Sequence, residues 1–270
     1  MNQLSSVALR RPPDHDPAAA AFPFALPAIR SLPVLRLDTA VTLFVGENGS
    51  GKSTLLEAIA IASRAITAGS AEAVEDPSLE GVRALATRLR LSWATRKHRG
   101  FYLRAEDFFG YAKRLAELKT GLERELAEAE IRHAGASDYA RSLALSPYRK
   151  ELAALRARYG EGLDAQSHGE SFLRFFAERF VPGGLYLLDE PEAPLSPSRQ
   201  LAFLALVKDM TARDGQFVIA THSPMLMAFP NATIYSFDAQ LIRQVAYHEV
   251  EHVQIMKSFL ESPQRYLRHL

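Results

Sequence analysis

A run of glycines followed by a lysine and a hydroxyl residue has the spacing that binds phosphate groups. The run fits G-x-x-x-x-G-K-[ST] at every position and consists of Gly46, Glu47, Asn48, Gly49, Ser50, Gly51, Lys52 and Ser53. Glycines let backbone N–H groups approach phosphate oxygens, Lys52 would reach the β- and γ-phosphates, and the Ser53 hydroxyl would bind Mg²⁺. A chance Gly-rich turn of this pattern arises in roughly 1% of chains of this length. We call the segment the phosphate loop, and it predicts a nucleotide site.

Two acidic residues, Asp189 and Glu190, follow the apolar segment 185–188. Ligands of α/β sheets bind at the carboxyl ends of the strands, which is where these side chains would lie. We expect Asp189 to hold Mg²⁺ and Glu190 to orient or deprotonate the water that attacks the γ-phosphate. Taken alone, such a pair is more often a helix cap or a solvated turn. The phosphate loop in the same chain favours the catalytic interpretation.

A histidine, His222, follows the second buried strand-like segment, 217–220. A lone histidine at a strand end is usually a hydrogen-bonded polar residue without a catalytic role. Because one helix separates this segment from the one that ends in Asp189, the two strands can be neighbours in the sheet. We therefore expect His222 to hydrogen-bond the γ-phosphate or the attacking water.

A fourth candidate, residues 166–171, precedes a predicted helix and contains Ser167 and Gly169. Backbone N–H groups at a helix N-terminus form an anion site. The alternative is a capping box between Ser167 and Glu170. The two interpretations are compatible with each other.

In order and spacing, these four elements resemble the ATP-binding cassette (ABC-type) ATPases over residues 41–237. More narrowly, the chain resembles small stand-alone bacterial AAA/ABC-type ATPases. The motifs that carry the resemblance are Gly-Glu-Asn-Gly-Ser-Gly-Lys-Ser-Thr, which ends at Thr54, Ser-His-Gly-Glu-Ser, Asp-Glu-Pro-Glu-Ala-Pro-Leu-Ser and Thr-His-Ser-Pro.

The resemblance implies a Mg²⁺-dependent ATP hydrolase that works as a head-to-tail dimer, with two ATP molecules between the protomers. Thr54 would join the phosphate loop in binding ATP, with Lys52, Glu190 and His222 at the reacting phosphate. Ser167 and Gly169 would face the partner's phosphate loop. Hydrolysis would drive engagement and release of the dimer on a protein or DNA partner.

Departures from the transporter cassettes favour this function over the nucleotide-binding subunit of a membrane transporter. A RecF-like DNA-binding ATPase is a second alternative that these departures leave open. The transporter signature Leu-Ser-Gly-Gly-Gln is altered at His168 and Glu170, and residues 53–165 contain no glutamine. Glu106 is a candidate substitute for the missing glutamine, with helix capping as the alternative. Ser196 stands where an aspartate usually couples the two protomers.

The case for DNA rests on a basic run that surrounds Trp93. Its members are Arg83, Arg88, Arg90, Arg96, Lys97, Arg99 and Arg104. Alternation over residues 83–103 predicts a strand pair with a turn at 96–100. One face of this hairpin could follow a phosphate backbone, or the charges could simply be solvated.

Strand-like and helical segments alternate along the chain, which predicts an α/β fold with a largely parallel sheet covered on both faces. This is the P-loop NTPase class with an ABC-type core sheet. We expect a loose tail at 1–23 and one ATPase domain at 24–270, with a helical insertion at about 107–165. Predicted helices span 53–66, 111–133, 147–158, 172–180, 198–213 and 253–260. His248 and His252 are interpreted as surface charge.

Composition narrows the class of protein. Of 270 residues, 47% are hydrophobic and 23% charged, which is typical of a globular chain, and the net charge is +1. The absence of cysteine excludes disulfides, iron–sulfur clusters and thiolate zinc sites, and it suits a reducing cytoplasm. Apolar stretches are far shorter than the ~18 residues of a membrane-spanning helix. We therefore expect a cytoplasmic protein without membrane insertion.

Overall fold

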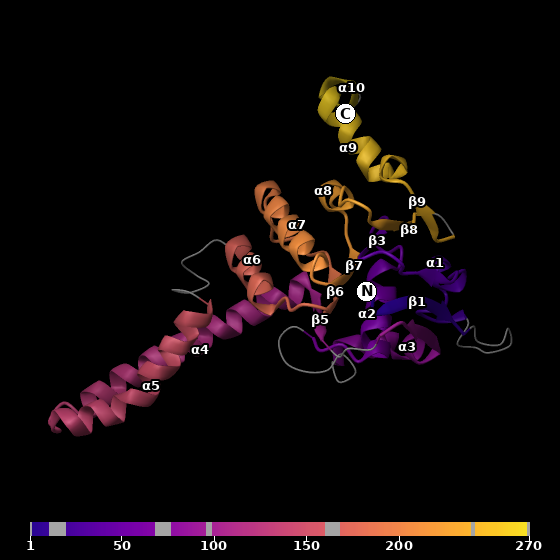
Figure 1. Ribbon diagram of the computed structural model, residues 1–270. Helices are drawn as coiled ribbons and strands as arrows, with labels where there is room; N and C mark the ends of the chain where they lie inside the picture. Colours follow the sequence, from indigo (N-terminus) through magenta and orange to yellow (C-terminus); the bar gives the residue numbers. More distant parts are fainter. Residues whose placement is uncertain are drawn as a thin grey trace. The chain divides into compact units, whose positions relative to one another are not determined.

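The computed structural model describes residues 2–10, 20–67, 77–95, 99–159, 168–238 and 241–268, without the side chains of 77–78, 106–116, 156–159 and 168. Contacts divide the chain into two compact units (Figure 1). The first contains Met1–Ala105 and Arg179–Leu270, and the second contains Glu106–Glu178. Because the first unit is built from both ends of the chain, the second is an insertion in its sequence.

A six-stranded sheet forms the centre of the first unit, with strand order β5-β6-β7-β3-β8-β9. All neighbours are parallel except β8 and β9. The strands are β3 (Val41–Val45), β5 (Gly100–Arg104), β6 (Leu185–Asp189), β7 (Gln216–Ala220), β8 (Thr233–Ser236) and β9 (Arg243–Val245). Every residue of β3, β6 and β7 is buried, as expected for parallel strands covered on both faces.

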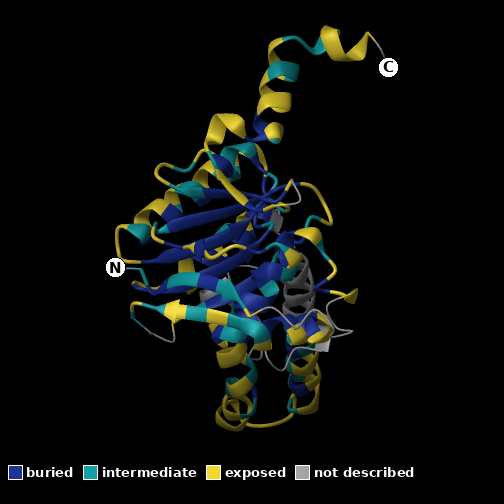
Figure 2. Ribbon diagram, turned by 90° about the vertical axis from the view of Figure 1, so that its right-hand side faces the viewer, coloured by how far each residue is buried: buried dark blue, intermediate teal, exposed yellow. Residues whose placement is uncertain are grey.

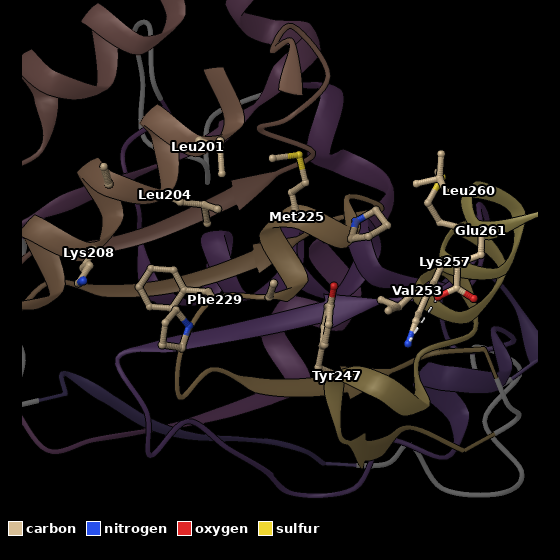
Figure 3. A pocket seen from close by; sticks show the side chains of 15 residues that line it. Leu201, Leu204, Lys208, Met225, Phe229, Tyr247, Val253, Lys257, Leu260 and Glu261 are labelled. Atoms are coloured by element: carbon tan, nitrogen blue, oxygen red, sulfur yellow. Dashed lines mark ion pairs between the residues drawn. The ribbon is translucent and has the colours of Figure 1, made fainter. Parts of the chain in front are cut away.

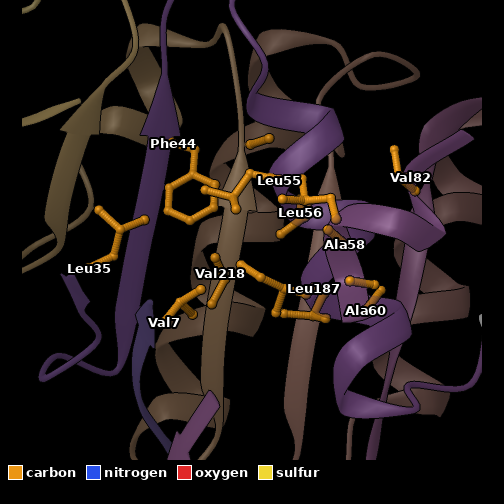
Figure 4. Close-up of a cluster of buried hydrophobic side chains, with 14 of the residues drawn as sticks. Val7, Leu35, Phe44, Leu55, Leu56, Ala58, Ala60, Val82, Leu187 and Val218 are labelled. Atoms are coloured by element: carbon orange, nitrogen blue, oxygen red, sulfur yellow. The ribbon is translucent and has the colours of Figure 1, made fainter. Parts of the chain in front are cut away.

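Alternate residues of β6 and β7 contribute to two separate apolar layers. On one face, Leu187 and Val218 pack with residues of helix α2 (Lys52–Ser63), as Figure 4 shows. On the other face, the rings of Tyr186 and Phe217 stack with their centroids 4.9 Å apart. Burial on both faces confirms the predicted mixed α/β architecture with a parallel central sheet.

A smaller antiparallel sheet has the order β2-β1-β4 and consists of β1 (Leu4–Leu9), β2 (Leu35–Arg36) and β4 (Leu89–Trp93). Residues 4–9 therefore do not belong to a loose tail, and that prediction is wrong for them. Leu4 and Val7 are fully buried and join the main core. The side chain of Gln216 on β7 bonds the backbone of Gln3 and Leu4, which fixes β1 to the larger sheet.

The predicted hairpin over residues 83–103 is not formed. Residues Arg83–Arg88 form helix α3, and β4 pairs with β1 in the small sheet. Strand β5 pairs instead with β6, and residue Thr67 bridges to Tyr102 on its other side. Burial alternates only in β4, between half-buried and exposed residues, whereas Phe101, Tyr102 and Leu103 of β5 are all buried.

Short helices complete the first unit. They are α1 (Pro27–Arg30), η2 (Pro77–Val82), α8 (Pro224–Met227), η3 (Tyr247–Glu249) and α10 (Pro263–Leu267). Two longer helices, α7 (Pro197–Thr211) and α9 (Glu251–Glu261), match predicted helices to within a few residues. Much of α9 and α10 is exposed (Figure 2).

The second unit is helical and contains α4 (Ala105–Arg132), α5 (Asp138–Tyr159) and α6 (His168–Arg179). Helices α4 and α5 lie side by side as an antiparallel hairpin, linked by a 3.1 Å ion pair between Glu130 and Arg149 (Figures 1 and 2). Helix α5 begins well before the predicted start at Pro147, which lies inside it. The unit continues past the predicted insertion boundary at 165 through α6, and residues 160–165 lie outside the described part.

Within the described residues, no helix combines the length and apolar character that a membrane span requires.

Candidate active site

The phosphate loop connects the end of β3 to the start of α2. Gly51 has φ +100° and is the N-cap of α2, so the first backbone N–H groups of the helix are free of intrahelical partners. Gly49 also has positive φ, and nothing lies within 4 Å of where its Cβ would be. A loop of this form can surround a phosphate with backbone N–H groups.

The carboxylate of Asp238, just after β8, anchors the first residues of the loop. Its Oδ1 accepts a 2.7 Å hydrogen bond from the Glu47 backbone N–H, and its Oδ2 accepts one from the Ser236 hydroxyl. Gly46 has φ +144°, and a Cβ there would lie 2.8 Å from Asp238 Oδ1. Asp238 was not predicted, because in the sequence it is only an acid that follows the segment 233–237.

Lys52 is 4% exposed and lies inside the arc of the loop. Its Nζ donates hydrogen bonds to the carbonyl oxygens of Gly46 (2.7 Å) and Glu47 (2.8 Å). Burial lowers the pKa of Lys52, and the carboxylates of Glu190 and Asp189 oppose that shift. The ammonium is thus placed among carboxylates at the carboxyl ends of the strands.

Ser53 and Asp189 lie close together although 136 residues separate them. The Ser53 hydroxyl donates a 3.0 Å hydrogen bond to Asp189 Oδ1. Asp189 is 7% exposed, and burial raises its pKa to about 7, while the bond from Ser53 acts in the opposite direction. A hydroxyl and a carboxylate are oxygen ligands of the kind that Mg²⁺ prefers beside nucleotide phosphates. The two residues therefore fit a magnesium ion.

Glu190 and His222 lie at the ends of the neighbouring strands β6 and β7. His222 Nε2 is 3.6 Å from Glu190 Oε1. Burial lowers the pKa of His222, the ammonium of Lys52 lowers it further, and Glu190 raises it. Glu190 is the more accessible partner, with 45% of its side chain exposed. A partly accessible carboxylate beside a neutral imidazole can accept a proton from water while the imidazole donates a hydrogen bond.

Glu192 was not predicted, yet it holds the turn that carries His222. Its Oε1 accepts hydrogen bonds from Thr221 Oγ1 (2.6 Å), the His222 N–H (2.7 Å) and the Ser223 N–H (3.1 Å). Burial raises the pKa of Glu192, and these hydrogen bonds oppose the shift. The sequence offered only the third acid of Asp-Glu-Pro-Glu as a signal.

His252 was expected at the surface, and that expectation is wrong. Its ring packs edge-to-face against His222, with the centroids 5.5 Å apart. Its Nδ1 is buried and has no hydrogen-bond partner among the described residues. Helix α9 therefore contacts the same histidine that Glu192 positions.

Two family models match the chain. One, described as "AAA domain, putative AbiEii toxin, Type IV TA system", matches residues 134–228, and the other, described as "AAA domain", matches residues 29–72. The first match includes Asp189, Glu190 and His222, and the second includes the phosphate loop. Over these two segments the chain matches AAA domains. The predicted superfamily and the predicted ATP hydrolase class are confirmed.

Solved structures similar to the ATPase include ABC cassettes and an SMC head. One is cbiO1 of Clostridium perfringens, part of the ABC transporter complex cbiONQ, with 16% identity, coverage of 88% of this chain and 91% of that chain, and a TM-score of 0.45. Another is a nucleotide-free cassette of an ABC transporter, with 18% identity, coverage of 86% of this chain and 88% of that chain, and a TM-score of 0.43. A third is an Smc head domain of Pyrococcus furiosus bound to the C-terminal domain of ScpA, with 12% identity, coverage of 84% of this chain and 94% of that chain, and a TM-score of 0.40. No curated protein sequence matches the ATPase.

The remaining predicted ligands are distributed over both units of the ATPase. Asn48 is an exposed residue of the phosphate loop, and Ser50 donates its backbone N–H to the Glu47 carbonyl. Thr54 is half-buried in the first turn of α2. Gly169 lies in the first turn of α6, in the second unit. Ser167 and the side chain of Glu106 lie outside the described residues.

The basic run does not form the predicted face. The guanidinium of Arg88 lies over the Phe24 ring at 5.8 Å, and Arg104 makes a 3.6 Å ion pair with Glu57. Arg83 belongs to α3, and Arg96 and Lys97 lie outside the described residues. The run thus spans a helix and two strands of different sheets.

A largely apolar groove of about 790 Å³ lies away from the predicted nucleotide ligands, none of which lines it. Figure 3 shows side chains of α7, of α8 with the residues after it, of η3 and of α9 around this groove. Helix α9 therefore lines the groove with Val253 and Leu260 and contacts His222 through His252.

Proposed function

We propose that the ATPase hydrolyses Mg²⁺-ATP between two head-to-tail protomers and that hydrolysis drives engagement and release of the dimer on a protein or DNA partner. The observation that carries the proposal is the 3.0 Å contact between Ser53 and Asp189 at the mouth of the phosphate loop. It supports one shared ion site between the loop and the carboxylate strand.

In this function Ser53 and Asp189 would hold a magnesium ion, which would supply positive charge beside the β- and γ-phosphates. Lys52 exchanges its bonds to the loop carbonyls for bonds to phosphate oxygens. The backbone N–H groups of the loop and of Thr54 hold the remaining phosphate oxygens. All of these groups interact with the negative charge of the phosphates, so their main contribution is to bind and orient the nucleotide.

Glu190 is the general base in the proposed mechanism. It accepts a proton from a water molecule, and the oxygen of that water attacks the γ-phosphorus as the bond to the β-phosphate oxygen breaks. The products are ADP and inorganic phosphate. His222 stays neutral because its pKa is lowered, and it donates a hydrogen bond to the γ-phosphate.

The dimer part of the proposal is supported by the placement of the signature-like segment. Gly169 and Glu170 lie in the first turn of α6, and the N-terminus of a helix is an anion site. In a head-to-tail dimer the backbone N–H groups of this turn would reach the γ-phosphate held by the partner's loop. The departures at His168 and Glu170 from the transporter signature favour a stand-alone ATPase over a transporter subunit.

The test is light scattering on Glu190→Gln with and without Mg²⁺-ATP. We expect ATP to convert the monomer to a dimer, because substrate that is bound but not hydrolysed holds the protomers together. The wild-type chain is the control and should dimerise only transiently. A variant that binds ATP and stays monomeric contradicts the homodimer.

The trapped dimer also identifies the class of partner. If the partner is DNA, affinity for labelled duplex should fall steeply between about 50 and about 200 mM salt. If the partner is a protein, the dimer should bind no duplex and should retain a protein that the monomer does not. The Glu190→Gln chain without ATP is the matched control for both measurements.

A further inference from the structure

The turn between β6 and α7 and the turn after β7 are joined by a single carboxylate. Glu192 Oε1 accepts three hydrogen bonds, and two of them come from the backbone N–H groups of His222 and Ser223. The third donor is the Thr221 hydroxyl, which itself accepts a bond from the Ser223 N–H. The orientation of the backbone at His222 therefore depends on Glu192.

A second connection holds the same two segments together. The Ser223 hydroxyl donates a 2.6 Å hydrogen bond to Gln200 Oε1 in α7, and Gln200 Nε2 donates to the Leu195 carbonyl. The Ser223 hydroxyl also accepts from the backbone of α8, which fixes the chain just after His222. These bonds leave the His222 backbone little freedom to rotate.

The geometry matters because Glu190 lies two residues before Glu192 in the same turn. The Glu190 backbone N–H donates to the Ala220 carbonyl at 2.9 Å, and its side chain lies 3.6 Å from His222. Holding both turns together fixes the separation of Glu190 and His222. In active sites, a displacement of about 1 Å can reduce the rate about 100-fold.

We infer that Glu192 is a positioning residue for hydrolysis: it holds His222 at a fixed distance from Glu190 and does not touch the nucleotide itself. The inference rests on the proposed function, in which His222 and Glu190 act on the γ-phosphate. It assigns the third acid of Asp-Glu-Pro-Glu a task distinct from those of Asp189 and Glu190.

The test compares Glu192→Ala with Glu192→Gln by steady-state hydrolysis of Mg²⁺-ATP. The alanine removes the acceptor, so we expect kcat to fall about 100-fold while KM for ATP changes little. The glutamine keeps an acceptor oxygen for the same donors, so it should retain most of kcat. Asp209→Asn, on the exposed face of α7, is the control and should match the wild type.

A double-mutant cycle with His222→Ala separates positioning from loss of fold. If Glu192 acts through His222, then Glu192→Ala should cost little more once the imidazole is gone. Full additivity of the two losses overturns the inference, as does an unchanged kcat in Glu192→Ala. If Glu192→Ala does not fold, Thr221→Val takes its place in the cycle, because it removes one of the three donors to Glu192. Full additivity of its loss with that of His222→Ala, or an unchanged kcat, then overturns the inference.

Glu190→Gln, measured in parallel, distinguishes this inference from the proposed function. If Glu190→Gln hydrolyses ATP like the wild type, the assignment of the general base fails. If Glu190→Gln is inactive while Glu192→Ala keeps the wild-type kcat, only the positioning role of Glu192 is wrong.

Discussion

The hydroxyl of Ser53 and the carboxylate of Asp189 are joined by a 3.0 Å hydrogen bond that links the first turn of α2 to the last residue of β6. The contact lies in a part of the protein where Asp189 is almost completely buried. Burial disfavours the charged form of this carboxylate and raises its pKa, and the nearby Lys52 ammonium only partly opposes that shift.

The first prediction concerns pH and the metal-free, nucleotide-free protein. The pKa of Asp189 is about 7 in the folded state, against 3.8 as the reference for an unfolded chain. Between these values the folded state binds more protons than the unfolded state, so the free energy of unfolding must fall as pH rises. The loss is complete above about pH 7 and absent below about pH 4, and its upper limit is about 4 kcal/mol.

Asp189→Asn removes this contribution, because an amide does not titrate but still accepts the bond from Ser53. We expect urea unfolding with EDTA to show a smaller loss of stability for the variant than for the wild type between about pH 5 and about pH 8. Equal losses in the two proteins would show that Asp189 ionises normally.

The second prediction concerns Lys52. Replacing Lys52 with Met removes the ammonium that lies inside the phosphate loop but keeps a side chain that can fill its buried space. Charge-assisted hydrogen bonds are worth about 1.5–3 kcal/mol, so affinity for ATP should fall about 10- to 100-fold. Titration with a fluorescent ATP analogue measures the dissociation constant. The control is Lys208→Met, at an exposed position of α7. A wild-type dissociation constant for Lys52→Met would place ATP elsewhere.

The third prediction concerns Gly46. An added methyl group would meet Asp238 Oδ1 at 2.8 Å, in a backbone conformation that L-residues rarely adopt. Gly46→Ala should therefore displace Asp238 from Glu47 and weaken both ATP binding and thermal stability. Gly121→Ala is the matched control, because nothing lies within 4 Å of that position in helix α4, and alanine should raise stability there. Equal effects of the two substitutions would refute the close contact.

The fourth prediction concerns Gln216, which is fully buried in β7. Its Oε1 accepts from the backbone N–H groups of Gln3 and Leu4, and its Nε2 donates to the carbonyls of Leu4 and Leu37. Gln216→Leu would leave these buried groups unpaired, at a cost of at least about 3 kcal/mol in the free energy of unfolding. Chemical denaturation checks this, with exposed Gln244→Leu as control. A loss no larger than the control's would mean that β1 is held by other contacts.

The sequence was informative where one short segment contains all the groups that act together. The phosphate loop is such a segment, and the buried runs before Asp189 and His222 revealed their strands by composition alone. The alternation of apolar residues over 83–103 led to the wrong prediction of a hairpin. Leu89 and Leu91 would alternate with polar residues in a hairpin, and they do so equally in the small sheet, where β4 pairs with β1. Local periodicity reports burial, not the identity of the neighbouring strand.

The missed residues act across long separations in sequence. Glu192 accepts hydrogen bonds from a turn that lies 30 residues further along the chain. Asp238 accepts one from Glu47, which is 191 residues earlier in the sequence. No local pattern distinguishes these acids from solvated ones. His252 was misjudged for the same reason, because only the fold brings α9 to His222.

Strand β3, which leads into the phosphate loop, has both of its sheet neighbours, β7 and β8, in the last quarter of the chain. On a ribosome, the segment that binds ATP must therefore emerge long before the strands that support it. Contacts so distant in sequence form late and slowly. During synthesis the apolar β3 stays exposed, which makes the nascent chain vulnerable to aggregation and a natural client for chaperones.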